Sequence, residues 1–278
     1  MRTDKVRELG LKSPIPVCTV SYALAREWLF SFSMSAVPLT HNLLLESMPE
    51  ESRKRLGDAG HIVELQLEDV PFREHEPTPV IFPLDCVISL LRGLEDGNEV
   101  EIGMVGPEGF IGVNGVLGVT LNPHTGLTQG RGAALSIATA AVREEMAREP
   151  RVAAMLHKFV YTHVTGISQL AACNRLHNVE RRLAHWLLLL HDRSGNDTIS
   201  LTHEFLSRML ATRRASITVA MGALSSAGAI EQARNRVRIS DRRQLEAMSC
   251  ECYESEVRDF ENALGFRPNA KKRVSEID

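Results

Sequence analysis

The sequence has no excess of charge of either sign and no long apolar stretch. Lysine and arginine number 32, aspartate and glutamate number 35, and the formal net charge is −3. The whole chain therefore does not attract polyanions, so a nucleic-acid site must be a local basic surface. No apolar run is long enough to cross a bilayer, and residues 17–37 lack the compact apolar core of a secretion signal. We expect a cytoplasmic protein with no membrane partner.

Cysteine is also scarce. The sequence contains Cys18, Cys86, Cys173, Cys250 and Cys252. An odd number without regular spacing argues against a disulfide-bonded secreted domain and fits a reducing compartment. Cys250 and Cys252 form the only close pair, and neither a second pair nor a nearby histidine stands at zinc-ligand spacing. We expect structural roles for both, with no metal site and no cofactor; a redox or metal role is the weaker alternative.

Catalytic motifs are missing as well. We find no serine–histidine–aspartate arrangement and no phosphate-binding loop. The glycine-rich stretch 103–118 lacks GxGxxG spacing and lies among predicted strands, where glycines serve turns and bulges. His163 and His177 are not four residues apart, and no carboxylate or cysteine completes a site with them, so we expect core or seam histidines. The sequence therefore predicts no enzyme.

The 278 residues are enough for two domains. Residues 1–35 lack periodicity, which predicts a disordered extension or a natural translation start at Met34. From 61 to 137, short alternating runs separated by turn residues predict an antiparallel barrel or jelly roll, and Leu94–Glu99 predicts a hairpin with Asp-Gly at its tip. The runs are Ile62–Leu67, Val80–Phe82, Val87–Leu91, Val100–Val105 and Ala134–Ile137.

A long helix is predicted over residues 151–175, with Pro150 suited to its first position. Residues recur along it at alternating steps of three and four, as in a heptad seam, and a polar Asn174 can fix pairing register. We expect the seam to pair with its twin in a second subunit; the alternative is packing on the chain's own β-domain. The seam residues are Leu156, Phe159, His163, Ile167, Leu170, Asn174 and His177.

Residues 200–224 predict two short helices joined by a tight turn. Thr202 and Thr212 stand where each helix is expected to begin, and both can cap free amides. The second helix presents polar side chains that suit phosphates and base edges. An ordinary helical hairpin with a solvated arginine face is the alternative. These side chains are Arg213, Arg214, Ser216 and Thr218.

A short hairpin is predicted next, over residues 230–239. Its tip is expected to carry Arg234, Arg236 and Arg238. Arginines on a hairpin that follows a recognition helix would contact phosphates. Because basic residues outnumber acids in this part of the chain, we favour a DNA-binding helix-turn-helix with a wing.

This order of parts resembles the Crp/Fnr family of bacterial transcription regulators. The resemblance covers about residues 43–253 and is carried by Gly106-Pro-Glu-Gly-Phe-Ile-Gly112, by residues 173–186 at the hinge and by residues 199–224. It implies an α+β fold with an N-terminal antiparallel, jelly-roll-like β-roll, a long dimerisation helix and a C-terminal winged helix-turn-helix.

The resemblance also implies a division of the chain. We expect an extension over 1–35, a cyclic-nucleotide-binding-like sensor domain over 36–148, a dimerisation helix and hinge over 149–178, a winged helix-turn-helix over 179–253 and a tail over 254–278.

The expected ligand pocket departs from the family pattern. Cyclic-nucleotide-binding members use a Gly-Glu pair for ribose and an Arg-Ser/Thr pair for phosphate. Gly112 matches the glycine, but Val113 replaces the glutamate, and Thr125 stands nearest the place of the arginine. Valine cannot accept hydrogen bonds, and a phosphate buried without arginine costs several kcal/mol. We expect a vestigial pocket without tight cyclic AMP binding, and only Cys18 precedes Cys86, so no oxygen-sensing cluster is indicated.

The resemblance implies a homodimeric, sequence-specific regulator on a palindromic promoter site, which senses an unknown signal. Its expected partners are double-stranded promoter DNA, a second copy of the chain and, as a further candidate, RNA polymerase. Arg214 matches a base-contacting arginine, whereas Ala215 and Val219 replace other family contacts, so the DNA sequence read should differ. Ala211 takes a turn position that is often glycine. The alternative is a ligand-sensing or partner-binding module with a degenerate helix-turn-helix.

Overall fold

The computed structural model describes residues 38–268. The expected extension over 1–35, the alternative start at Met34, Cys18 and the last ten residues of the expected tail lie outside the described residues. Among the helices of the described part, none is both long and apolar enough to cross a membrane.

Short helices precede the β-roll: η1 (Leu39–His41), α1 (Leu43–Ser47) and α2 (Glu50–Ala59). The side chain of Asn42 caps α1 by accepting a hydrogen bond from the Leu45 amide at 3.0 Å. Glu50 and Glu51 occupy the first turn of α2, where carboxylates oppose the positive end of the helix dipole.

Two three-stranded antiparallel sheets form the β-roll, with strand orders β1-β6-β2 and β4-β3-β5. The short helix α3 (Val113–Val116) lies between β4 and β5 in the sequence. The strands are β1 (Gly60–Leu65), β2 (Val80–Pro83), β3 (Ile88–Gly93), β4 (Glu99–Val105), β5 (Thr125–Thr128) and β6 (Gly132–Ile137).

The predicted strands match five of these within about two residues, and the Asp96–Gly97 hairpin joins β3 to β4 as expected. Gly97 has a φ of 82°, which a two-residue tip of this kind favours. Strand β5 was not predicted, because Thr-Gly-Leu-Thr shows little apolar alternation. A Cβ on its Gly126 would lie 2.3 Å from a ring carbon of Phe72, so the glycine allows that ring to approach the strand.

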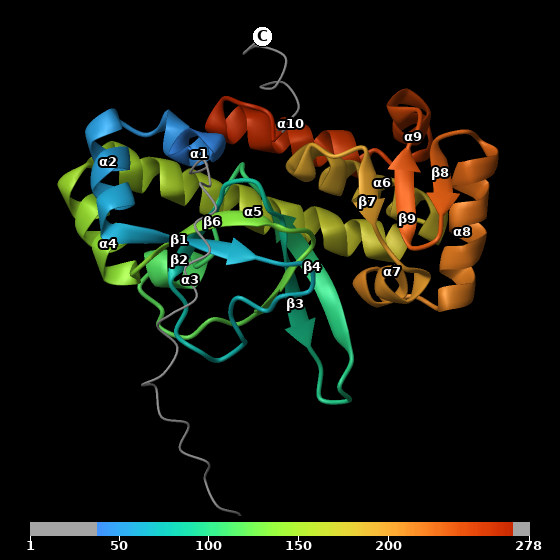
Figure 1. Cartoon of the computed structure of the whole chain (residues 1–278), viewed down its shortest axis with the longest axis horizontal. Helices are drawn as coiled ribbons and strands as arrows, with labels where there is room; N and C mark the ends of the chain where they lie inside the picture. Colours follow the sequence, from blue (N-terminus) through green and yellow to red (C-terminus); the bar gives the residue numbers. More distant parts are fainter. Residues whose placement is uncertain (1–37, 269–278) are drawn as a thin grey trace, which may run out of the picture. The chain divides into compact units, whose positions relative to one another are not determined.

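Helices α4 (Thr139–Arg148) and α5 (Pro150–Leu176) follow the roll, and α5 extends from the roll toward the C-terminal elements (Figure 1). Leu156 and Phe159 of α5 are buried in the chain's own core, 0% and 3% exposed. The Phe159 ring lies 4.9 Å from that of Phe110, centroid to centroid. The dimer-seam prediction is therefore wrong for these two residues, because the roll covers that face of the helix.

The C-terminal elements form a winged helix-turn-helix, so the predicted α+β class is confirmed. The sheet order is β7-β9-β8. The elements are α6 (Val179–Ser194), β7 (Thr198–Ser200), α7 (His203–Met209), α8 (Arg214–Ser226), β8 (Ile230–Ala233), β9 (Arg236–Ile239), α9 (Arg242–Met248) and α10 (Cys252–Leu264).

A second core is shared between the roll and these C-terminal elements. Leu183 and Leu187 of α6 are fully buried in it, together with the apolar faces of α7 and α8. The roll contributes Val87, Leu91, Met104 and Leu127 to the same cluster. The C-terminal elements therefore rest on the roll through apolar contacts.

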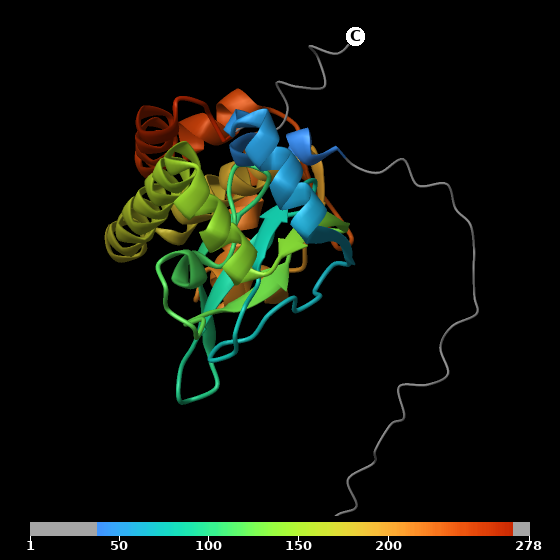
Figure 2. The same cartoon turned by 90° about the vertical axis from the view of Figure 1, so that its left-hand side faces the viewer.

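The segment expected as a tail from residue 254 is a packed helix over most of its described length. Helix α10 lies alongside α5 (Figure 2), and Val257 and Phe260 are buried. The ring of Phe260 meets that of Phe159 edge to face at 6.5 Å. The expectation of a tail missed this amphipathic helix, which closes the first core.

Candidate nucleic-acid interface

The turn between α7 and α8 sets the angle of the predicted recognition helix. Thr202 caps α7 by accepting a hydrogen bond from the Phe205 amide at 3.0 Å, as predicted. Ala211 has a φ of +45°, the left-handed geometry expected at this position. Thr212 lies within the turn and donates its amide to the Ser207 carbonyl. The predicted Thr212 cap is therefore wrong, because α8 begins at Arg214 with Arg213 before it and no side-chain cap.

Helix α8 has one buried and one exposed face. Ile217, Met221 and Leu224 are at most 1% exposed, which fixes the helix on its apolar side. Arg213, Arg214 and Thr218 are exposed, and Ser216 is half-buried. The Thr218 hydroxyl donates to the Arg214 carbonyl and lies 3.1 Å from His203 Nδ1. The front of α8 thus presents two guanidiniums and a positioned hydroxyl to solvent.

Strands β8 and β9 form the predicted wing, but its tip carries fewer arginines than expected. Arg234 and Asn235 make the turn, and Arg236 opens β9. Arg238 lies in the middle of β9, opposite Glu231, and the two form an ion pair of 2.7 Å. The prediction that Arg238 lies at the tip is wrong, since the strand pairing places it against that carboxylate.

A surface hollow separates the helix-turn-helix from the wing. Arg214 borders it on one side, and Arg234 and Arg236 border it on the other. His203 and the exposed Glu204 at the start of α7 complete the polar rim. Three guanidiniums against one carboxylate give this hollow a net positive rim although the whole chain is slightly acidic.

Buried polar contacts join α6 to the roll. Trp186 Nε1 donates to Glu101 Oε1 at 2.9 Å, and Ser89 donates to Oε2 of the same carboxyl at 2.6 Å. Burial raises the pKa of Glu101 to about 7, although these two hydrogen bonds act in the opposite direction and lower it. Arg193 donates to Glu108 at 2.8 Å and pairs with Glu256 of α10 at 3.3 Å. Glu108 belongs to the Gly-Pro-Glu-Gly motif, but nothing in the sequence indicated the partners of either carboxylate.

The residues expected to form the ligand pocket serve the roll's own structure. Gly112 has a φ of 98°, and a Cβ there would lie 2.9 Å from the Pro79 carbonyl oxygen. Val113 begins α3 and is half-buried. The Thr125 hydroxyl accepts the Glu74 amide at 3.2 Å. The Glu74 carboxylate in turn pairs with Arg92 at 2.8 Å, so this arginine is already engaged by a carboxylate.

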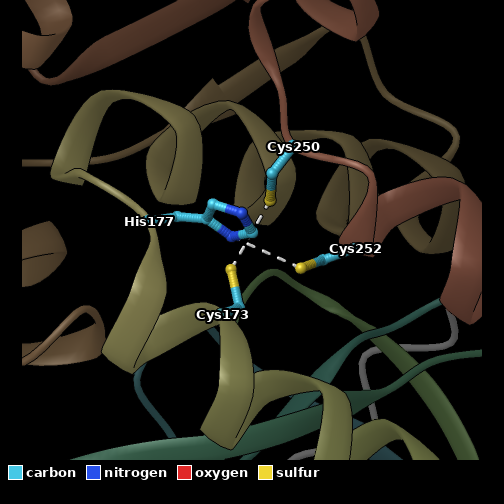
Figure 3. Close-up of side chains that lie close together, drawn as sticks. All are labelled: Cys173, His177, Cys250 and Cys252. Atoms are coloured by element: carbon cyan, nitrogen blue, oxygen red, sulfur yellow. Dashed lines mark hydrogen bonds between the residues drawn. The ribbon is translucent and has the colours of Figure 1, made fainter.

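Thiols and an imidazole meet at the end of α5. Ligand atoms of Cys173, His177, Cys250 and Cys252 all lie within 4.8 Å of one another (Figure 3). The expectation that no cysteine completes a site with His177 is therefore wrong. His177 lies beside Cys250 and Cys252 in space, although no histidine stands at zinc-ligand spacing from them in the sequence. The spacing Cys173-x-x-x-His177 places both side chains on one helix face and is the sequence signal for their proximity.

His163, which was expected in the core or in the seam, is half-buried. It packs against the ring of Phe159 at 6.5 Å, and burial lowers its pKa to about 4. Its neutral form therefore dominates near neutral pH.

Comparison with known proteins agrees with this architecture. Residues 181–248 match the family of Crp-like helix-turn-helix domains. FixK2 from Bradyrhizobium japonicum superposes with a TM-score of 0.60 at 12% identity, covering 69% of this chain and 98% of that one. The c-di-GMP-responsive global regulator CLP from Xanthomonas campestris gives 0.58 at 14% identity, covering 69% and 100%. A Crp/Fnr-family transcriptional regulator from Thermus thermophilus gives 0.55 at 18% identity, covering 70% and 100%.

None of the curated protein sequences compared with the chain matches it. At the identities of the solved structures, the likeness concerns the fold. The chain therefore contains a Crp-like helix-turn-helix domain, and it has the cyclic-nucleotide-binding-like and helix-turn-helix architecture of the Crp/Fnr transcriptional regulators.

Proposed function

We propose that this protein is a sequence-specific DNA-binding transcription regulator without catalytic activity. The observation that carries the proposal is the solvent-facing pair Arg213–Arg214 at the start of α8, of which Arg214 lies across the hollow from Arg234 and Arg236 of the wing. A helix held on its apolar face, with cations at its front, fits a DNA major groove.

Each cationic side chain takes a different part in this proposal. Arg214 reads a base edge, because an arginine in the groove can donate two hydrogen bonds to guanine. Arg213, Arg234 and Arg236 neutralise phosphates, and Ser216 and Thr218 add hydroxyl contacts. Arg238 contributes less, since Glu231 already balances its charge. Ala215 and Val219 face solvent, so the sequence preference differs from that of family members with polar contacts there.

The proposed regulator is a homodimer that pairs through the uncovered face of α5. Tyr161 and Val164 are 59% and 56% exposed, and Ser168 and Ala171 continue this stripe at steps of four and three. Three residues of the heptad-like seam predicted from the sequence remain accessible: Ile167 and Leu170 are half-buried and Asn174 is exposed. They can therefore border the pairing surface. We call the winged helix-turn-helix, residues 179–253, the reading head. Two reading heads related by a two-fold axis imply a palindromic promoter site.

The signal reaches the reading heads, in this proposal, from the roll through the hinge where α5 ends and α6 begins. The ligand of the roll is not cyclic AMP in this proposal, because Val113 cannot accept hydrogen bonds from ribose and Thr125 stands nearest the place of the phosphate-binding arginine. The cytoplasm is the proposed compartment, since Cys86, Cys173, Cys250 and Cys252 are free thiols. RNA polymerase stays a candidate partner.

The test is a gel shift on DNA from upstream of the protein's own gene and operon, at several salt concentrations. We expect a shift that weakens steeply as salt rises. Arg214→Ala is expected to weaken the shift, by about 1–3 kcal/mol of binding, while Arg131→Ala, which removes an exposed arginine of the roll, should leave it unchanged. Absence of a shift at low salt, followed by genome-wide selection that enriches no site, would favour the ligand-sensing module with a degenerate helix-turn-helix.

A further inference from the structure

Four side chains from two distant segments converge on one point beneath the hinge. Cys173 and His177 belong to the last turn and end of α5, and Cys250 and Cys252 flank the start of α10. The three sulfurs and the imidazole of His177 point toward one another (Figure 3). The cysteines are at most 4% exposed, and the His177 side chain is 13% exposed. The group is therefore shielded from solvent.

Two of the distances between these atoms are close to those around a single tetrahedral ion. Zn–S bonds of about 2.3 Å and Zn–N bonds of about 2.0 Å separate two sulfurs by about 3.8 Å and a sulfur from a nitrogen by about 3.5 Å. Cys173 Sγ lies 3.5 Å from Cys250 Sγ, and Cys252 Sγ lies 3.5 Å from His177 Nδ1. An iron–sulfur cluster would hold its ligands further apart, because its own iron and sulfide atoms lie between them.

The surroundings also suit a bound cation. His177 turns Nδ1 toward the sulfurs, while its Nε2 lies 3.4 Å from a Glu251 carboxylate oxygen; a carboxylate behind a ligating histidine fixes its orientation. His185 Nδ1 lies 3.6 Å from Cys173 Sγ and can donate a hydrogen bond to that sulfur. Three thiolates and one neutral imidazole around a dication carry one negative charge, which this donor helps to stabilise.

We propose that Cys173, His177, Cys250 and Cys252 form a structural Cys3His zinc site that ties the end of α5 to the start of α10. Four protein ligands close the coordination sphere, so the ion has no open position for catalysis. On binding, each thiol releases its proton to solvent and the zinc takes the sulfur lone pairs, with no change of oxidation state. The site does not depend on DNA binding by the chain.

The test uses the full chain, freed of any histidine tag and kept reduced. We expect about one zinc per chain by elemental mass spectrometry. After removal of zinc by a chelator, Co²⁺ should restore the visible absorption of tetrahedral cobalt together with a thiolate charge-transfer band, and Zn²⁺ should abolish both. Stripping the ion should also lower the Tm. Each of these readouts uses the unmutated chain, so none depends on a variant that folds.

Variants then assign the ligands. Cys250→Ser and Cys252→Ser are expected to lower zinc affinity by about 100-fold or more, since even changes behind a ligand cost about 10- to 100-fold. Cys86→Ser, which alters a buried thiol of the roll away from the cluster, should leave affinity unchanged. Three outcomes would overturn the proposal: no cobalt spectrum in the stripped chain, unchanged zinc content in a Cys250→Ser/Cys252→Ser double variant, or a Cys173–Cys250 disulfide in a separate sample purified without air and without reductant.

Discussion

Trp186 of α6 donates its indole N–H to the buried carboxyl group of Glu101 on β4, 85 positions away in the sequence, at 2.9 Å. The side chain of Glu101 is shut off from water, and the residue is 5% exposed. This hydrogen bond links the reading head directly to the roll. It also places a titratable group at the contact between the two.

Glu101 is expected to make stability depend on pH. Its pKa is raised from 4.5 in the unfolded chain to about 7 in the fold, so between these values the folded state holds a proton that the unfolded state has lost. Stability should therefore fall as pH rises from about 4.5 to about 7, by roughly 3 kcal/mol from this group. Urea unfolding of the parent and Glu101→Gln across this range measures the difference. Equal pH slopes in the two proteins would contradict it.

Arg214 and Arg234 are expected to contribute differently to DNA binding, Arg214 to base recognition and Arg234 to phosphate contact. Arg214→Ala should cost about 1–3 kcal/mol of binding and relax preference at one base, whereas Arg234→Ala should weaken binding evenly and reduce the salt slope by about 1. Arg238→Ala should have the smaller effect, because Glu231 pairs with it. Fluorescence anisotropy on the selected site and on single-base variants separates these effects. The roles are wrongly assigned if Arg234→Ala changes base preference and Arg214→Ala does not.

Val164→Glu is expected to break the proposed dimer. A carboxylate in an apolar helix seam is costly to bury, so the protein should sediment as a monomer of 30.8 kDa. Leu94→Glu is the matched control, because Leu94 is also 56% exposed but lies at the roll hairpin. A Val164→Glu variant that still sediments as a dimer would exclude this face as the interface.

Ala211 stores backbone strain in the turn before α8. Replacement by glycine should raise stability by up to about 1 kcal/mol, since glycine adopts φ of +45° without a Cβ clash. Ala215→Gly, on the exposed face of α8, should lower stability by up to about 0.5–1 kcal/mol instead. Thermal or urea unfolding compares the two. A loss of stability in both variants would show that the turn is unstrained.

Cyclic AMP is expected not to bind tightly. Val113 offers no acceptor for ribose, and the Thr125 hydroxyl already accepts the Glu74 amide. Isothermal titration of the full chain should give no micromolar binding. Heat that saturates at one nucleotide per chain in the micromolar range would prove this prediction wrong.

Local patterns were enough to predict much of this fold. The alternating runs gave most strands of the roll, and the start of α5 at Pro150 and the cap at Thr202 follow from single residues with strong positional preferences. Most of the predictions that were wrong concerned contacts between segments far apart in the sequence. The periodicity of α5 identified a face but not its partner, and Phe110 occupies the side assigned to a second subunit.

Long-range pairings account for the missed parts of the site. Arg238 was expected at the wing tip because periodicity does not show which strand residue lies opposite it, and the register puts Glu231 there. Cys173 lies 77 positions from Cys250, and their proximity depends on how α10 packs on α5. No spacing rule within one segment could bring those sulfurs together.

The second core limits the transfer of the winged helix-turn-helix to other proteins. Met104 and Leu127 of the roll share that core with Leu183 and Leu187 of α6. A fragment cut at the hinge would therefore expose an apolar face to water, which is unfavourable and promotes aggregation. A chimera that grafts residues 179–268 onto another β-roll domain should stay soluble only if that domain supplies matching apolar side chains. The roll and the winged helix-turn-helix are in this sense one folding unit, because each completes an apolar core of the other.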